Sequence, residues 1–167
     1  RVPRSEFRVL LCRPLPKWQS FWYPHGMSAK AAAAAPPKSA DVPKASGRVL
    51  IIDNDEPHAL TVADGLERVG FTCTTATSGT EGVKQLEFDV VITDLMMNDV
   101  DGLEVLSRAK NDQPDAEVIL VTGHGTVPSA VQAMQQGAFN YLLKPLDIEH
   151  LRAVTEKAAS SARLRRT

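Results

Sequence analysis

The sequence has few cysteines and no long apolar run. Only Cys12 and Cys73 are present among 167 residues, and they form no CxxC pair. Two cysteines cannot build a disulfide framework, so we expect a reducing, cytoplasmic location and no cysteine-based zinc site. No apolar run approaches the roughly 18 residues that a membrane helix needs, and we therefore expect no association with a membrane.

An excess of charge of either sign is also missing. The formal net charge is -1 at pH 7, although 23% of the residues are charged. Such a balance gives no general attraction to nucleic acids or anionic membranes, so no direct nucleic-acid binding is expected. The hydrophobic fraction of 43% is that of an ordinary globular protein, and the length suggests one domain with an appendage.

Residues 1–47 differ from the remainder of the chain. Aromatic residues and prolines in 1–26 follow no helical or strand period, and Met27 is available as a natural start. This segment has the composition of a transit peptide, but we favour upstream or added residues without a fold of their own. Residues 28–47, rich in Ala, Pro, Lys and Ser, indicate a flexible linker. We therefore assign 1–47 to a leader, 48–162 to the folded domain and 163–167 to a tail.

Strand and helix patterns alternate five times through the folded part. The expected strands cover 49–52, 71–75, 90–93, 118–121 and 139–143. Helical patterns follow at 57–69, 78–87, 103–109 and 127–136, and from 147 onward. This alternation favours an α/β fold with a parallel sheet covered by helices on both faces. Because the Thr-rich second strand suits an edge, we predict a flavodoxin-like, doubly wound (βα)5 sandwich with strand order 2-1-3-4-5.

Polar residues with matching chemistry follow four of these strands: Asp53, Asn54 and Asp55 after the first, Asp94 after the third, Thr122 after the fourth, and Lys144 after the fifth. The carboxyl ends of parallel strands meet at one edge, where open α/β sheets hold their sites. Carboxylate oxygens suit Mg²⁺, and an ionised carboxylate can attack phosphorus while a lysine neutralises the transferring group. Singly, these residues are explained as helix caps or turn residues; together they predict a phosphoryl-transfer site.

Residues 48–160 resemble a response-regulator receiver domain, the phosphoacceptor module of two-component signalling. The resemblance rests on four motifs: Ile51-Ile52-Asp53-Asn54-Asp55, Val91-Ile92-Thr93-Asp94, Val121-Thr122-Gly123-His124-Gly125 and Tyr141-Leu142-Leu143-Lys144-Pro145. The phrases TGHGTV and GAFNYLLKP are most similar to receivers of nitrogen-regulator type, which are attached to enhancer-binding ATPases.

This resemblance implies a role for each site residue. Asp94 would be phosphorylated by a sensor histidine kinase, with Lys144 pairing with the phosphoryl oxygens ahead of a cis bond to Pro145. The Mg²⁺ ligands would come from Asp53, Asn54, Asp94 and the backbone carbonyl of Met96. Thr122 and Tyr141 would form the switch, and Asp55 would tune dephosphorylation. The implied site thus consists of the phosphoacceptor with its lysine, the metal ligands, the switch residues and the tuning residue.

The resemblance also implies a regulatory domain that catalyses only its own phosphotransfer and dephosphorylation. Its output face would comprise the helix at 127–136, the strand at 139–143 and the helix from 147. An output domain or another protein would bind there, and a homodimer of the receiver is a further alternative.

Two residues depart from the family pattern. Asn54 stands where a second acidic metal ligand is usual, which predicts weaker Mg²⁺ binding unless Asp55 compensates. Asn98 replaces a common proline, which predicts a looser loop after Asp94. A degenerate receiver that binds partners without being phosphorylated therefore remains an alternative.

Two other classes fit less well. Asp53 and Asp55 match the DxD spacing of haloacid-dehalogenase-type phosphatases, but no further acidic pair follows Lys144. A flavodoxin-like FMN binder would need a phosphate loop rich in Ser, Thr and Gly after the first strand. The arginines in 163–166 are interpreted as favourable charges at a helix end, not as a DNA-binding patch.

Overall fold

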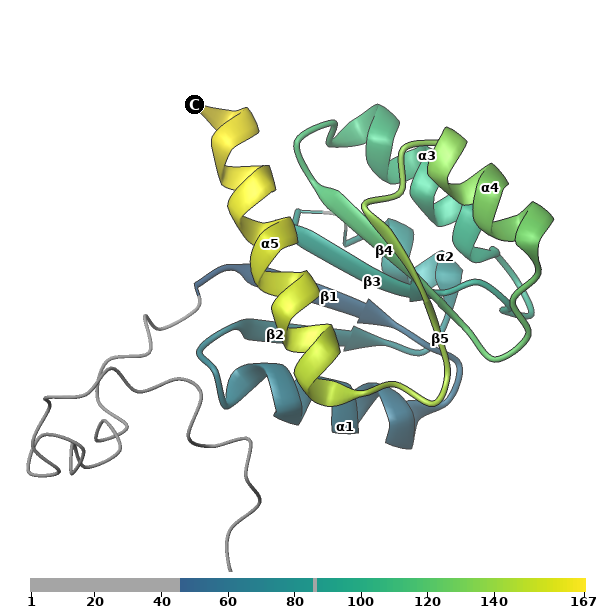
Figure 1. Cartoon of the computed structure of the whole chain (residues 1–167), viewed down its shortest axis with the longest axis horizontal. Helices are drawn as coiled ribbons and strands as arrows, with labels where there is room; N and C mark the ends of the chain where they lie inside the picture. Colours follow the sequence, from purple (N-terminus) through teal and green to yellow (C-terminus); the bar gives the residue numbers. More distant parts are fainter. Residues whose placement is uncertain (1–45, 86) are drawn as a thin grey trace, which may run out of the picture. The chain divides into compact units, whose positions relative to one another are not determined.

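The computed structural model describes residues 46–167 except residue 86 (Figure 1). Nearly all of the expected leader lies outside these residues, so its assignment stays a prediction. The described elements are β1 (Arg48–Ile52), α1 (Glu56–Glu67), β2 (Thr72–Ala76), α2 (Gly79–Val83), β3 (Val90–Asp94), α3 (Gly102–Asp112), β4 (Glu117–Thr122), α4 (Val127–Gln135), β5 (Asn140–Leu143) and α5 (Ile148–Arg166). Strands and helices alternate, as predicted.

The five strands form one parallel sheet with the order β2-β1-β3-β4-β5, which confirms the predicted topology. Every residue of β3 and β4 is buried, whereas the Thr-rich β2 lies at an edge and is partly exposed. Asp94 pairs in register with Val121, and Thr122 pairs with Leu143. The ends of β3, β4 and β5 therefore meet at one edge of the sheet.

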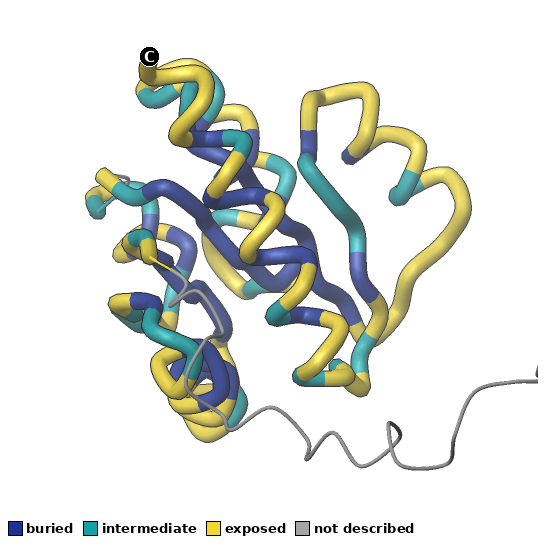
Figure 2. The backbone as a smooth tube through the Cα atoms, turned by 60° about the vertical axis from the view of Figure 1, so that its left-hand side comes forward, coloured by how far each residue is buried: buried dark blue, intermediate teal, exposed yellow. Residues whose placement is uncertain are grey.

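Helices cover both faces of the sheet (Figure 1). Alternate residues of β1 point to opposite faces, with Val49 and Ile51 in one core and Leu50 and Ile52 in the other. The first core includes buried residues of α1 and α5, and the second includes buried residues of α3 and α4. Figure 2 shows the central strands in the dark blue of buried residues and the outer helical surfaces in yellow. The strands that lead to the site are therefore held in place by an apolar core on each face of the sheet.

Each helix begins at a side chain that caps its first turn. Ser78 accepts a hydrogen bond from the backbone N–H of Glu81, and Asp147 caps α5 through the backbone N–H of Glu149. Asp55 does the same for α1, only three residues after β1 ends. Such caps satisfy N–H groups that lack helical partners. They also fix the direction in which the chain leaves the sheet edge.

Two predicted boundaries were wrong. The helix expected to reach residue 87 ends at Val83, because Lys84 and Gln85 close tight turns onto residues three positions earlier. The expected tail at 163–167 is mostly helical, since α5 continues to Arg166. Arg165 pairs with Glu117 at 3.2 Å, and Arg166 donates to Asp89, so these charges hold the last turn of α5 against the sheet. None of the helices in the described part is long and apolar enough to cross a membrane.

Candidate functional site

The predicted carboxylates and lysine meet at the carboxyl edge of the sheet. Lys144 Nζ lies 2.7 Å from Asp53 Oδ2 and 2.7 Å from Asp94 Oδ2. The two carboxylates come from the ends of β1 and β3, and Asp53 and Asp94 are only 3% and 8% exposed. Lys144 follows β5, and its bond to Pro145 is cis, as predicted. One ammonium therefore bridges two buried carboxylates.

Asp53 is held in its ionised form by its neighbours. Burial alone would raise its pKa, but hydrogen bonds from Lys144, the backbone N–H of Asp55 and His58 bring the pKa below the ordinary value. Its Oδ1 accepts the Asp55 N–H at 2.9 Å, and its Oδ2 lies 2.6 Å from His58 Nδ1. The carboxylate is thus negative at neutral pH, as a metal ligand must be.

The paired carboxylates hold Lys144 in its charged form in turn. Burial would lower the pKa of Lys144, but its hydrogen bonds to Asp53 and Asp94 raise the pKa above the ordinary value. The ammonium is thus placed to pair with an anionic group that is carried on Asp94. The site therefore suits a phosphoryl group.

His58 is a site residue that the sequence reasoning missed. It occupies the third position of α1, after the cap Asp55, and contacts Asp53. Side chains in the first turn of a helix point toward its N-terminus, here toward the end of β1. A cap recognised at Asp55 would have fixed the first residue of the helix. His58 could then have been placed in the first turn, beside Asp53.

The other candidate metal ligands are exposed. Asn54 lies on the surface beside Asp53, and Met96 is 66% exposed. The backbone N–H of Met96 donates to Asp94 Oδ1 at 2.9 Å, which sets the start of the loop after β3. Asp55 accepts the N–H of His58 as the cap of α1. It is therefore engaged with the helix and offers no clear replacement for the acidic group missing at position 54.

The donor set fits Mg²⁺ better than a metal that needs a cage of side chains. Across the described residues, no three His, Cys, Asp or Glu side chains form a metal site by themselves. Mg²⁺ commonly uses one or two carboxylates, keeps several waters and binds substrate phosphate. Asp53 and Asp94 could supply the carboxylates, and the backbone carbonyl of Met96 stays an expected ligand. The arrangement is suited to a hydrated ion and not to a structural metal.

The two expected switch residues lie on neighbouring strands. Thr122 is fully buried at the end of β4, and its hydroxyl accepts the backbone N–H of His124 at 3.2 Å. Tyr141 in β5 hydrogen-bonds through its hydroxyl to Ser129 of α4 at 2.9 Å. Each side chain is thus engaged with the segment that follows β4. Neither contacts Asp94 through a hydrogen bond in this structure.

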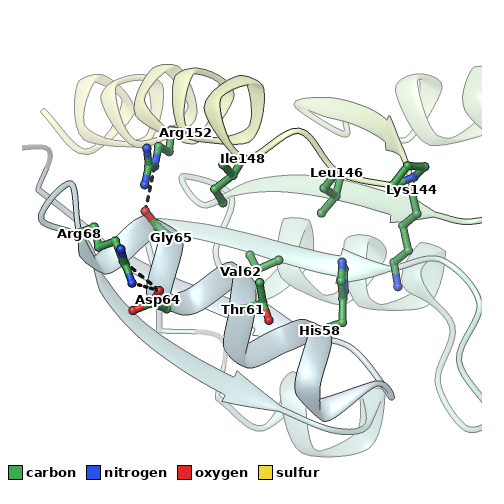
Figure 3. Close-up of a pocket in the computed structure, with 11 residues that line it drawn as sticks. His58, Thr61, Val62, Asp64, Gly65, Arg68, Lys144, Leu146, Ile148 and Arg152 are labelled. Atoms are coloured by element: carbon green, nitrogen blue, oxygen red, sulfur yellow. Dashed lines mark hydrogen bonds and ion pairs between the residues drawn. The ribbon is translucent and has the colours of Figure 1, made fainter. Parts of the chain in front are cut away.

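A groove of about 540 Å³ adjoins the site between α1 and the start of α5 (Figure 3). His58 and Lys144 line the end of the groove nearest the carboxylates, while Val62 and Ile148 line it farther along. The groove is thus beside the carboxylate cluster, and a separate cavity of about 10 Å³ lies between Asp53, Asp94 and core residues. The candidate site therefore lies at the sheet edge, where Lys144 meets the two carboxylates, next to this groove.

Comparison with known proteins agrees with this geometry. Residues 49–156, more than half of the chain, match the response regulator receiver domain. The chain is 38% identical over 117 residues to the DNA-binding transcriptional regulator NtrC of Escherichia coli K12, covering 68% of this chain and 25% of NtrC. It thus spans about a quarter of the length of that relative. The expected likeness to nitrogen-regulator receivers is confirmed.

Solved structures give the same result. A response regulator receiver domain protein from Clostridium thermocellum aligns with a TM-score of 0.67 and 34% identity, over 70% of this chain and 97% of that one. A response regulator from Burkholderia pseudomallei, with a phosphorylated aspartic acid, calcium ion and citrate, aligns with a TM-score of 0.62 and 33% identity, over 72% of both chains. With its sheet order and its matching motifs, this chain belongs to the response regulator receiver domain family, the receiver of two-component systems.

Proposed function

We propose that Asp94 accepts a phosphoryl group from the phosphohistidine of a sensor histidine kinase and thereby switches a signalling surface. The observation that carries this proposal is the position of Lys144, whose Nζ is 2.7 Å from Asp94 Oδ2. An ammonium already placed at the accepting carboxylate can stabilise negative charge on the incoming group without reorganising. The domain acts only in its own phosphotransfer and dephosphorylation, as a regulatory module.

The chemistry requires a nucleophilic carboxylate. One oxygen of Asp94 attacks phosphorus, the bond from phosphorus to the donor nitrogen breaks, and a new P–O bond gives an acyl phosphate. Asp53, Asn54, Asp94 and the Met96 carbonyl would hold Mg²⁺, which neutralises charge on the phosphoryl oxygens when bound. Lys144, which follows β5 at the same edge of the sheet, pairs with the same oxygens. The protein thus contributes mainly position and charge.

The phosphoryl group would then change the contacts of Thr122. It adds about -1.5 to -2 charges and three acceptor oxygens beside a buried hydroxyl. The Thr122 hydroxyl would turn to donate to it, the loop that begins at Gly123 would follow, and Tyr141 would leave Ser129. The phosphoryl group can shift the equilibrium between the inactive and active states only by the difference in how strongly it stabilises each state.

We place the output at α4, β5 and α5, as the sequence predicted. Several large apolar side chains are exposed on α4 and β5: Val127, Val131, Met134 and Leu143. Exposed apolar side chains that adjoin one another mark surfaces for protein partners. An output domain, a separate partner or a second copy of the receiver would bind here when the switch changes.

Incubation with acetyl phosphate and Mg²⁺, followed by intact mass measurement, tests the proposal. We expect one phosphoryl group on the wild-type chain, lost on removal of Mg²⁺ and in Asp94→Asn. Asp89→Asn is a control, because Asp89 is a buried carboxylate at the other end of β3. It should keep the adduct if it folds, as checked by circular dichroism. An adduct that persists in Asp94→Asn, or none from acetyl phosphate or a kinase, would contradict the proposal.

The neutral, exposed Asn54 supports a second candidate, a receiver that binds partners without phosphorylation. An amide offers Mg²⁺ an oxygen but one negative charge fewer than a carboxylate. Asn54→Asp separates the candidates. If the native site is active but weak, the variant should need less Mg²⁺ for the same adduct. If only the variant forms an adduct, the native chain is the degenerate form.

A further inference from the structure

Asp99, on the loop between β3 and α3, ties that loop to the first turn of α2. Its Oδ1 accepts the backbone N–H of Gly79 at 3.1 Å, and its Oδ2 accepts that of Thr80 at 2.8 Å. Hydrogen bonding from Thr80, first through its side chain and then through its backbone, holds the pKa of Asp99 well below its ordinary range. The carboxylate is therefore charged at neutral pH, the form in which both hydrogen bonds are strongest.

The backbone of this loop also lies directly against α2. A Cβ atom at Gly79 would be 2.1 Å from the carbonyl oxygen of Val100 and 2.8 Å from its Cβ. No side chain fits in that space, so glycine permits the close approach of the two backbones. Val100 is partly buried against the core on the α3 side. The loop is thus held on α2 by packing as well as by the Asp99 carboxylate.

The same loop carries the backbone carbonyl assigned to the metal site. It starts at Asp94, whose Oδ1 accepts the N–H of Met96 at 2.9 Å. In the described part of the chain, Asp99 makes the hydrogen bonds that join residues 96–100 to a neighbouring helix. Asn98 supplies no proline ring to restrain this stretch. The looser loop expected from Asn98 therefore has a compensating tie, which the sequence pattern did not predict.

We propose that Asp99 is a positioning residue for phosphotransfer, because it holds this loop where the Met96 carbonyl completes the Mg²⁺ site. The inference rests on the proposed function. Without the Asp99 charge, only a fraction of molecules has the carbonyl correctly placed, and the apparent Mg²⁺ affinity falls by that fraction. At saturating Mg²⁺, the bound ion selects the molecules whose loop is correctly placed. The reaction at Asp94 then proceeds at the same rate as in the wild type.

The test compares Asp99→Asn with Asp101→Asn in the full chain. Asp101 is a matched control on the same loop: it caps α3 through the Glu104 N–H at 2.8 Å, and among the described residues it has no hydrogen bond to α2. Adduct formation from acetyl phosphate is followed by intact mass across a range of Mg²⁺ concentrations. We expect Asp99→Asn to raise the half-saturating Mg²⁺ concentration about tenfold, the low end for loss of an outer-shell partner, with an unchanged rate at saturation. Asp101→Asn should stay within about twofold of wild type.

Three results would overturn the inference: an unchanged Mg²⁺ requirement in folded Asp99→Asn, an equal shift in both variants, or a loss confined to the saturated rate. Circular dichroism establishes that each variant is folded. Calorimetric titration of Mg²⁺ without a phosphoryl donor separates this inference from the proposed function. A wild-type chain that forms no adduct refutes phosphoacceptance, whereas the calorimetric affinities of wild type and Asp99→Asn still decide the role of Asp99.

Discussion

His58 Nδ1 lies 2.6 Å from Asp53 Oδ2, an oxygen that also binds Lys144 Nζ. Since Asp53 is ionised, the imidazole donates this hydrogen bond through Nδ1–H. A carboxylate oxygen has about two acceptor positions, so both positions on Oδ2 are already used. An ion or its bound water must then approach Asp53 through Oδ1 or displace one of these partners.

His58→Leu should therefore strengthen Mg²⁺ binding. The substitution frees one acceptor position on Asp53 and removes a hydrogen bond that disperses its charge. We expect the half-saturating Mg²⁺ concentration for phosphorylation to fall about threefold, a smaller effect than loss of a supporting outer-shell partner. His150→Leu is the control, because His150 is exposed on α5. A higher Mg²⁺ requirement in His58→Leu would show that the histidine supports the site.

Asp53 should make the domain less stable in acid. Its pKa is lower in the folded chain than the ordinary value of about 3.9 in an unfolded chain. It therefore contributes stability above that unfolded pKa, and the contribution is lost as the pH falls through the folded pKa. Urea unfolding of wild type and Asp53→Asn between pH 6 and pH 2 measures this. The wild-type free energy of unfolding should fall more steeply below about pH 4; parallel curves would contradict the assignment.

The hydroxyl of Tyr141 and that of Ser129 should be energetically coupled. They are 2.9 Å apart and partly buried, and Ser129 also takes part in the capping box of α4 with Thr126. A double-mutant cycle of Ser129→Ala and Tyr141→Phe removes the contribution of the cap and isolates the pair. We expect a coupling free energy of about 0.5 to 1.5 kcal/mol from urea unfolding. Additive effects would mean that the pair does not restrain Tyr141.

Glu117→Ala should be strongly destabilising. This carboxylate is 1% exposed at the start of β4 and contacts Lys110 at 3.0 Å and Ser161 at 2.7 Å. Removing one partner of a buried ion pair leaves the other charge without a partner. We therefore expect a loss of about 3 kcal/mol in the free energy of unfolding. Glu104→Ala is the comparison, since Glu104 pairs with Arg108 on the exposed face of α3. Its loss should be about 0.5 kcal/mol or less.

The sheet and the central residues of the site were both predictable from the strand pattern. Apolar runs marked the strands, and parallel pairing brings their ends together, so Asp94 and Lys144 had to approach each other. Tertiary contacts were harder to foresee. The contact of His58 with Asp53 depends on where α1 begins, and that of Asp99 with Thr80 joins residues 19 positions apart. No periodic pattern in the sequence encodes such a pair.

The end of the short α2 was unpredictable on different grounds. Its start near residue 78 was expected, but nothing in the apolar spacing indicated that the helix would end at Val83. Helices this short receive most of their stability from tertiary packing. In α2 that packing includes the loop carrying Val100, which the sequence could not place.

The burial of both ends of β4 limits what can move when charge arrives at Asp94. Glu117 anchors the first residue to α3 and α5, while Thr122, the last residue, is enclosed. The strand cannot slide without breaking its anchors, and its ladder to β3 and β5 would break with it. Next to β4, we therefore expect only rotation about the Thr122 side-chain bond and movement of residues 123–126, which are exposed. The backbone of the sheet would serve as a fixed frame, while residues 123–126 and the side chains of Thr122 and Tyr141 move.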